Sequence, residues 1–257
     1  MVCLPSVMEP LVVSLSAAFT EPTFCRVVVL MVGAILARGS RTVTSMLRTV
    51  RPWAPGHFSS YHRVFSRAPC SLWLLGRTLA SAILRFIPPD EPILVPTDDT
   101  TAQHRGKHVY GKGCHHDAVR SSHRHVVWRW GHRWVVLAPS VKLPFTSRRW
   151  ALPVLAALYR PQELDRSEHR RHKTPPCLAR QLMAVLIHWF PARRFVFLGD
   201  GGFASHELAK FCFDHPRHAT LVSRFPCDAN LYAPPRPYEG KGRPAVKGNK
   251  LPCPRQV

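Results

Sequence analysis

The stretch Pro92-Ile93-Leu94-Val95-Pro96-Thr97-Asp98-Asp99-Thr100 brings a short apolar run up to two adjacent carboxylates. A similar stretch follows later in the chain, Arg194-Phe195-Val196-Phe197-Leu198-Gly199-Asp200-Gly201-Gly202. Short apolar runs bounded by Pro, Gly and charged residues are typical of buried strands. We therefore expect two strands, at 93–97 and 194–199, and each of them ends at an acid.

The composition predicts a globular protein with a polyanionic partner. The chain has 257 residues, of which 46% are hydrophobic, enough for a substantial core in one or two domains. Lysine and arginine number 36 against 15 acids, for a formal net charge of +21. This excess favours nucleic acid as the partner, because protein cations that bind phosphates release counterions. An anionic membrane surface is the weaker alternative, since the charge is spread along the whole chain.

The cysteines and apolar runs indicate neither secretion nor membrane insertion. The eight cysteines form no Cys-x-x-Cys pair, so a zinc ribbon or redox motif is not supported, and we expect reduced thiols in a cytosolic protein. The longest apolar run, 27–37, is too short to span a bilayer, and the N-terminus lacks the basic start of a signal peptide.

Helical patterns fill the first third of the chain. Residues 23–37 suit a buried helix, and 40–48 suit a second helix capped by Ser40 or Thr42. This pair matches a DNA-reading helix-turn-helix as well as it matches two packed helices of any bundle. A third helix at 71–86 has an apolar stripe that we expect to face the core: Leu72, Leu75, Leu79, Ile83 and Phe86. The Pro-rich segment 88–92 ends this helical domain, which we place at 1–89.

Strand patterns begin after that boundary. Segments 125–130 and 133–138 flank Gly131-His132 as a hairpin or as two neighbouring strands. Segment 151–158 fits a strand or a helix, and 162–173 is a solvated charged loop. Helix, strand, helix and strand follow at 178–189, 194–199, 204–214 and 220–223. This order predicts an α/β domain at 90–225 with a ribonuclease H-like mixed sheet and flanking helices, and then an extended or mobile tail at 226–257.

The acids at the two strand ends suit divalent cations. Carboxylates are ligands for Mg²⁺, and two ions about 4 Å apart can stabilise the attacking and leaving oxygens of a phosphodiester. A structural explanation is also open, in which Asp98 or Asp99 caps a turn and Asp200 caps a helix that begins near Gly202. Gly201 and Gly202 favour the metal site, since glycine lets a phosphate backbone approach closely.

Motifs around these acids carry a family resemblance. They are Val95-Pro96-Thr97-Asp98-Asp99-Thr100, Arg105-Gly106-Lys107 and Leu198-Gly199-Asp200-Gly201-Gly202-Phe203-Ala204. Together they resemble bacterial insertion-sequence transposases of the DDE superfamily. The resemblance runs from about Phe19 to the C-terminus and includes the segments 39–44, 61–68, 150–153, 221–225, 228–229 and 242–244.

The resemblance implies a ribonuclease H-like domain that cuts DNA at transposon ends and joins the freed 3′ hydroxyl to a target. It implies Mg²⁺ or Mn²⁺ as cofactor, with terminal-repeat and target DNA as partners. It further implies no membrane partner, a homo-oligomer on DNA, and a cytoplasmic, nucleoid-associated location. On this chain the catalytic and metal-binding acids are Asp98, with Asp99 as its alternative, and Asp200.

Members of the family supply a third acid, a glutamate, from a late helix. The candidates Glu207, Asp228 and Glu239 do not lie on such a helix. We therefore expect a C-terminally truncated and catalytically impaired copy. A non-catalytic basic remnant that only binds DNA is the alternative, and a generic polyanion-binding protein is a weaker one.

Basic and aromatic residues between the acids complete the prediction. We expect DNA contacts from Arg105, Lys107, Lys112, Arg120, Arg124 and Lys173. A histidine metal site is a weaker alternative, because no helical i, i+4 pair supports it; its members would be His115, His116, Asp117, His123 and His125. Three tryptophans, Trp128, Trp130 and Trp134, alternate as strand residues do, and this pattern favours core or sheet packing over base stacking.

Overall fold

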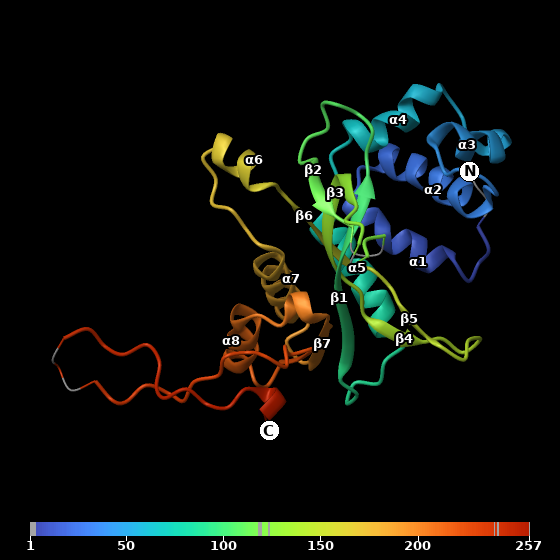
Figure 1. Ribbon diagram of the computed structural model, residues 1–257. Coiled ribbons are helices and arrows are strands. Elements are labelled where there is room, and N and C mark those ends of the chain that lie inside the picture. Colours follow the sequence, from blue (N-terminus) through green and yellow to red (C-terminus); the bar gives the residue numbers. More distant parts are fainter. Residues whose placement is uncertain (1–3, 118–119, 123, 239, 241, 257) are drawn as a thin grey trace. The chain divides into compact units, whose positions relative to one another are not determined.

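The chain forms two compact units in the computed structural model, which describes residues 4–117, 120–122, 124–238, 240 and 242–256 (Figure 1). Unit 1 comprises Met1–Pro88 and Val141–Val154, and unit 2 comprises Pro89–Ser140 and Leu155–Val257. The functional division at 1–89, 90–225 and 226–257 stays a prediction. Within the described ranges, no helix combines the length and the apolar character that crossing a bilayer requires.

Unit 1 is mainly helical. Its elements are α1 (Glu9–Ser14), η1 (Leu15–Ala18), α2 (Glu21–Leu36), α3 (Val43–Thr49), η2 (Arg51–Trp53), α4 (Phe58–Ser66), α5 (Leu72–Leu84), and a small sheet of β4 (Ser140–Lys142) and β5 (Arg149–Ala151). The helices expected at 23–37 and 40–48 are confirmed as α2 and α3. Thr42 is the N-cap of α3, since its hydroxyl accepts from the Ser45 N–H at 3.2 Å. Helices α2, α3 and α4 share a core that includes Val29, Leu30, Val50 and Tyr61.

The predicted core stripe of α5 is wrong at its two ends, while Leu75, Leu79 and Ile83 between them are half-buried. Leu72 and Phe86 are 70% and 57% exposed, whereas the buried face of the helix carries Gly76, Ala80 and Leu84. Helix α5 packs against η1, and small residues let two backbones approach closely. The large apolar residues of the sequence pattern therefore did not indicate the smaller residues that are buried on α5.

Unit 2 is built on a six-stranded mixed sheet in the order β2-β3-β1-β7-β8, with β6 also paired to β3. The strands are β1 (Ile93–Gln103), β2 (Gly113–His116), β3 (Trp128–Leu137), β6 (Leu155–Tyr159), β7 (Phe195–Gly199) and β8 (Ala219–Ser223). Strand β1 is antiparallel to β3 and parallel to β7, and β7 is parallel to β8. The expected α/β class, a mixed sheet with flanking helices, is confirmed.

Two strands are longer than the sequence predicted. Strand β1 does not end at Thr97 but continues to Gln103, because β3 pairs with it over this whole extension. The segments around Gly131 form one strand, β3, and neither a hairpin nor two neighbouring strands. A Cβ on Gly131 would lie 2.1 Å from the Ala102 carbonyl oxygen, so glycine is required here by the close approach of β1.

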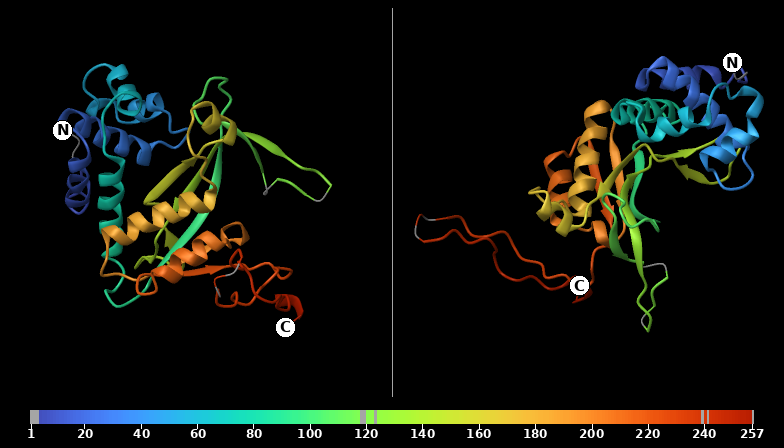
Figure 2. Two further views of the ribbon diagram at one scale, coloured as in Figure 1. Left: turned by 90° about the vertical axis from the view of Figure 1, so that its left-hand side faces the viewer. Right: turned by 90° about the horizontal axis from the view of Figure 1, so that it is seen from above.

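Helices α6 (Gln162–Ser167), α7 (Pro175–Trp189) and α8 (His206–Asp214) accompany the sheet, with short 3₁₀ turns η3 (Gly201–Phe203) and η4 (Pro254–Gln256). Figure 2 shows α7 and α8 side by side along the sheet, where they contact β3, β6 and β8. Alternate residues of the central strands are buried: Ile93, Val95, Thr97, Val135, Leu137, Phe195 and Phe197. The expected helices at 178–189 and 204–214 are confirmed.

The segment 162–173 is not simply a solvated loop. It contains α6, and Asp165 is only 4% exposed. Its carboxylate lies 2.9 Å from Arg160 Nε and 2.9 Å from His172 Nδ1, so a buried polar cluster fixes this connection. Beyond β8, the described residues contain no further named strand, only the bridge Tyr232–Lys250 and η4.

Candidate active site

Asp98 lies on β1, and Asp200 directly follows the adjacent parallel strand β7, where the two strands separate. The last pair of the β1–β7 register joins Thr97 to Gly199. Asp98 and Asp200 are the residues that directly follow this pair. Neighbouring strands are about 4.8 Å apart, and residues of equal parity point to one face. Ligands commonly bind beyond the carboxyl ends of parallel strands. The register therefore brings the two predicted acids together.

Asp99 belongs to the opposite face. Its Oδ2 accepts from Arg133 Nη2 at 2.5 Å, and the two residues are diagonal neighbours on β1 and β3. This ion pair is partly exposed, with the two side chains 34% and 25% accessible for Arg133 and Asp99. Arg133 was not among the predicted site residues; a charged residue within the apolar run of β3 was the signal for it.

The Asp98 carboxylate is held in an environment that disfavours its charge. Partial burial is the main cause that raises the pKa of Asp98, and the negative charges of Asp99 and Asp200 raise it further. The Asp99 N–H, which donates to Asp98 Oδ1 at 2.8 Å, opposes this rise. A cation between the acids would relieve the repulsion.

Both carboxylates also retain an oxygen for a ligand. Asp200 caps η3, since its Oδ1 accepts from the Gly202 N–H at 2.9 Å, and Ser223 Oγ donates to its carbonyl at 2.6 Å. The capping role is therefore real, and it holds the side chain in place. In the described part of the chain, Oδ2 of Asp98 and Oδ2 of Asp200 have no hydrogen-bond or ion-pair partner. A Cβ on Gly202 would lie 3.2 Å from Asp200 Oδ1, so this glycine keeps the carboxylate accessible. Two hard oxygen donors on adjacent strands fit Mg²⁺ or Mn²⁺.

No third ligand joins this pair among the described residues, in which no group of three His, Cys, Asp or Glu side chains could hold a metal ion. Glu207 instead accepts from Arg180 Nε at 2.7 Å. Asp228 is exposed in the segment after β8, and Glu239 lies outside the described residues.

Among the described residues, the histidines of the alternative metal site form no group that could hold a metal ion. His115 is buried against Tyr159, at 5.8 Å between ring centroids, and burial together with the charge of Arg133 lowers its pKa. His116 lies on the other face of the strand, 5.7 Å from the Trp128 ring, and His123 lies outside the described residues. Asp117 forms an ion pair with Arg129 at 2.8 Å.

The predicted DNA-binding cations occupy three places. Arg105, Lys107 and Lys112 share the β1–β2 connection, where Lys112 Nζ donates to the Gly106 carbonyl at 2.6 Å. Arg120 and Arg124 are exposed on the β2–β3 connection. Lys173 precedes α7 and lines a separate hollow of about 370 Å³ with Arg170 and Arg171.

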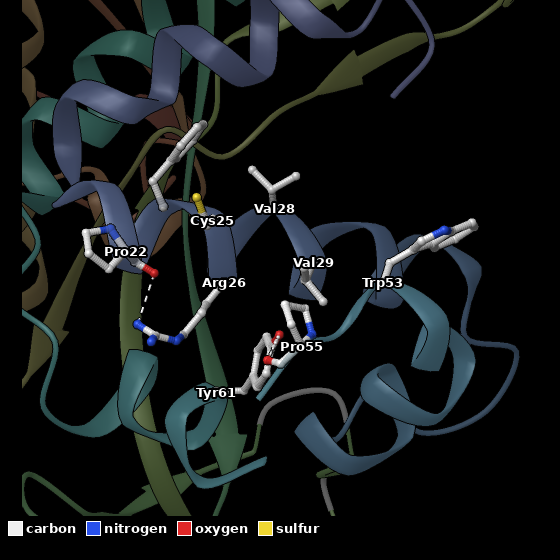
Figure 3. Close-up of a pocket in the computed structure, with 9 residues that line it drawn as sticks. Pro22, Cys25, Arg26, Val28, Val29, Trp53, Pro55 and Tyr61 are labelled. Atoms are coloured by element: carbon white, nitrogen blue, oxygen red, sulfur yellow. Dashed lines mark hydrogen bonds between the residues drawn. The ribbon is translucent and has the colours of Figure 1, made fainter. Parts of the chain in front are cut away.

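A larger hollow, of about 470 Å³, lies in unit 1 (Figure 3). Its described lining is mainly apolar: Pro22, Phe24, Cys25, Arg26, Val28, Val29, Trp53, Pro55 and Tyr61. The Arg26 guanidinium donates to the Pro22 carbonyl at 3.0 Å, and the Tyr61 hydroxyl donates to the Pro55 carbonyl at 3.0 Å. This lining includes no carboxylate, so the hollow is unsuited to hard cations.

A mixed sheet that presents acids where two adjacent parallel strands separate is the architecture of a ribonuclease H-like nuclease. The sequence matches the family model described as DDE superfamily endonuclease over residues 14–257. The chain belongs to this family, whose substrate is DNA and whose members generally use divalent metal ions. None of the curated proteins compared with the chain matches it.

Proposed function

We propose that this chain is an insertion-sequence transposase, which cleaves DNA at the ends of its element and transfers the freed strand to a target. In this proposal Asp98 and Asp200 are the acids that hold Mg²⁺ or Mn²⁺. A bound divalent ion supplies charge stabilisation for the scissile phosphate and favours ionisation of the attacking oxygen. The exposed cations of the β1–β2 and β2–β3 connections bind the DNA backbone.

The single observation that carries the proposal is the β1–β7 register beyond Thr97 and Gly199. It supports Asp98 over Asp99 as the first ligand, because Asp99 is already neutralised by Arg133. The raised pKa of Asp98 is also typical of carboxyl groups at functional sites, such as cation-binding sites.

We further propose that the site is impaired. The described residues offer two carboxylates and no third ligand beside them, so a metal ion is held weakly and cleavage is slow. The same observation favours the second candidate function, a basic remnant that binds DNA without cutting it.

Metal binding and nicking can be measured separately on the purified chain. Calorimetric titration with Mn²⁺ should give weak binding that Asp98→Asn and Asp200→Asn each remove. The exposed acid Asp228 provides a matched control, and Asp228→Asn should bind like the wild type. Unchanged Mn²⁺ binding in both site variants would refute the metal site.

The second measurement uses supercoiled DNA that carries the ends of the encoding element. Slow nicking that requires Mn²⁺ or Mg²⁺ and is lost in Asp98→Asn supports the impaired transposase. Tight, salt-sensitive DNA binding with no nicking at any metal concentration supports the remnant.

A further inference from the structure

Two tryptophans of β3 are exposed, against the expectation that they pack in the core or sheet. Trp128 is 62% exposed and Trp130 is 58% exposed. With His132 and Trp134 they occupy every second position of the strand. The four side chains therefore lie on one face of the sheet. We call Trp128, Trp130, His132 and Trp134 the aromatic stripe. Exposed apolar rings that are grouped on one face mark a binding surface more often than rings that are scattered singly.

The aromatic stripe leads to the candidate active site. In the β1–β3 register Trp134 is opposite Thr100, and Val136, the next residue of that face, is opposite Asp98. The stripe therefore shares its face with the Asp98 side chain, whereas Asp99 and Arg133 belong to the other face. From Trp130 to Val136 the strand rises by about 20 Å, a distance that several unpaired nucleotides can span.

Lysine, arginine and histidine side chains surround the stripe. Lys112 Nζ lies 5.4 Å from the centre of the Trp130 ring, close enough for a cation–π contact. His116 contacts Trp128, and His104 contacts His132 at 4.4 Å between ring centroids. The acid of this region, Asp117, is paired with Arg129 on the opposite face. Further exposed cations lie in the β1–β2 connection (Arg105 and Lys107) and in the β2–β3 connection (Arg120 and Arg124).

We propose that the aromatic stripe is a stacking platform for unpaired bases of the DNA strand that enters the Asp98–Asp200 site. Aromatic rings beside cations bind single strands because every base offers a π-face and the cations contact its phosphates. In an intact duplex those faces are covered by neighbouring bases. The substrate is accordingly DNA with several unpaired nucleotides next to the reacting phosphate, and this assignment rests on the proposed function.

The test compares two DNA ligands in EDTA, so that neither metal nor cleavage contributes. One is a blunt duplex, and the other carries a single-stranded tail of about six nucleotides. Fluorescence anisotropy should show that the wild type prefers the tailed duplex, and that Trp128→Ala and Trp130→Ala each weaken tailed-duplex binding roughly 5- to 100-fold. Blunt-duplex affinity should change less than twofold, and Trp→Phe variants should recover most of the preference.

Trp150 provides the matched control, because it is 50% exposed on β5 and lies outside the stripe. Trp150→Ala should bind both ligands like the wild type. Equal affinity of the wild type for the two ligands would overturn the proposal. So would a Trp128→Ala,Trp130→Ala variant that loses self-association but keeps the preference for the tail, since the tryptophans would then form a protein interface.

The outcome is separable from that of the proposed function. Asp98→Asn should keep the preference for the tailed duplex although it removes metal binding. Tail preference without any nicking would refute cleavage and leave the platform standing. Nicking without tail preference would refute the stacking platform and leave the proposed cleavage activity intact.

Discussion

Arg133 holds Asp99 in an ion pair at 2.5 Å, while the preceding residue, Asp98, faces the negative charge of Asp200 across two strands. Adjacent carboxylates thus have opposite effects on stability. Because the pKa of Asp98 is raised in the fold, ionised Asp98 costs stability as pH rises above the ordinary value of 3.8. At neutral pH the charge of Asp98 is therefore destabilising, and that of Asp99 is stabilising.

Asparagine at each position should separate these effects. At pH 7 without metal, Asp98→Asn should melt at the wild-type temperature or above it, whereas Asp99→Asn should be destabilised by about 1 kcal/mol, a value reduced by the exposure of the ion pair. Differential scanning fluorimetry measures both. If Asp98→Asn melts well below Asp99→Asn, the assignment of the two carboxylates is reversed.

Divalent metal that binds Asp98 and Asp200 should stabilise the wild type. Binding to the folded state alone adds about 1.4 kcal/mol at a metal concentration ten times Kd. Titration with MnCl₂ should raise the melting temperature of the wild type but not that of Asp98→Asn or Asp200→Asn. An equal rise in Asp98→Asn would show that the ion binds elsewhere.

Gly131 should be intolerant of a side chain. Its Cβ would meet the Ala102 carbonyl oxygen at 2.1 Å, a backbone atom that can move only if β1 and β3 separate. We expect Gly131→Ala to destabilise the fold by about 3 kcal/mol, at the upper end of overpacking effects. Gly39, with no atom within 4 Å of its Cβ position, is the control: Gly39→Ala should be neutral or slightly stabilising. Urea denaturation followed by circular dichroism distinguishes the two, and similar midpoints would contradict the close approach.

Local patterns predicted the elements whose apolar residues face a single large core. The runs that became α7, β7 and α8 are of this kind, since α7 alone buries six residues and contacts β3, β6 and α8. The acids Asp98 and Asp200 could be selected because each follows such a run. The polar half of β1, in contrast, is a strand only because β3 pairs with it. Pairing between distant segments leaves no signal in a short window of sequence.

The same limit explains the errors around the site. Alternation assigned Trp128, Trp130 and Trp134 to one face, but it could not tell whether anything covers that face. The Asp99–Arg133 pair depends on the register of two strands, so this ground for preferring Asp98 to Asp99 is not visible in the sequence. On α5, Gly76 and Ala80 were overlooked because small residues add little to an apolar pattern.

Cys212 should differ from the exposed cysteines in reactivity. Burial on α8 raises the pKa of its thiol to about 11 from the ordinary 9.0, whereas Cys25, Cys70 and Cys227 are exposed. Iodoacetamide at pH 8.5 should therefore label the exposed thiols of the folded protein and leave Cys212 unmodified, as peptide mass spectrometry can show. Since the unfolded chain loses this proton first, stability should fall between pH 9 and 11, and Cys212→Ala should reduce that fall. Rapid native labelling of Cys212 would show that α8 opens readily.

Exposed cations of the β1–β2 connection should set the salt dependence of DNA binding. Arg105 and Lys107 are exposed, and no acid lies between Thr100 and His116 to neutralise them. Each phosphate contact contributes about 0.9 to the slope of log K against log salt for duplex DNA. Arg105→Ala,Lys107→Ala should therefore lower the slope by about two and weaken all duplexes alike. Lys210 is the matched control, because it is already paired with Asp214 at 3.0 Å on α8, and Lys210→Ala should leave the slope unchanged. Equal slopes for the double variant and the wild type would mean that DNA does not cross this loop, and the phosphate contacts would then have to come from Arg120, Arg124 or the hollow beside Lys173.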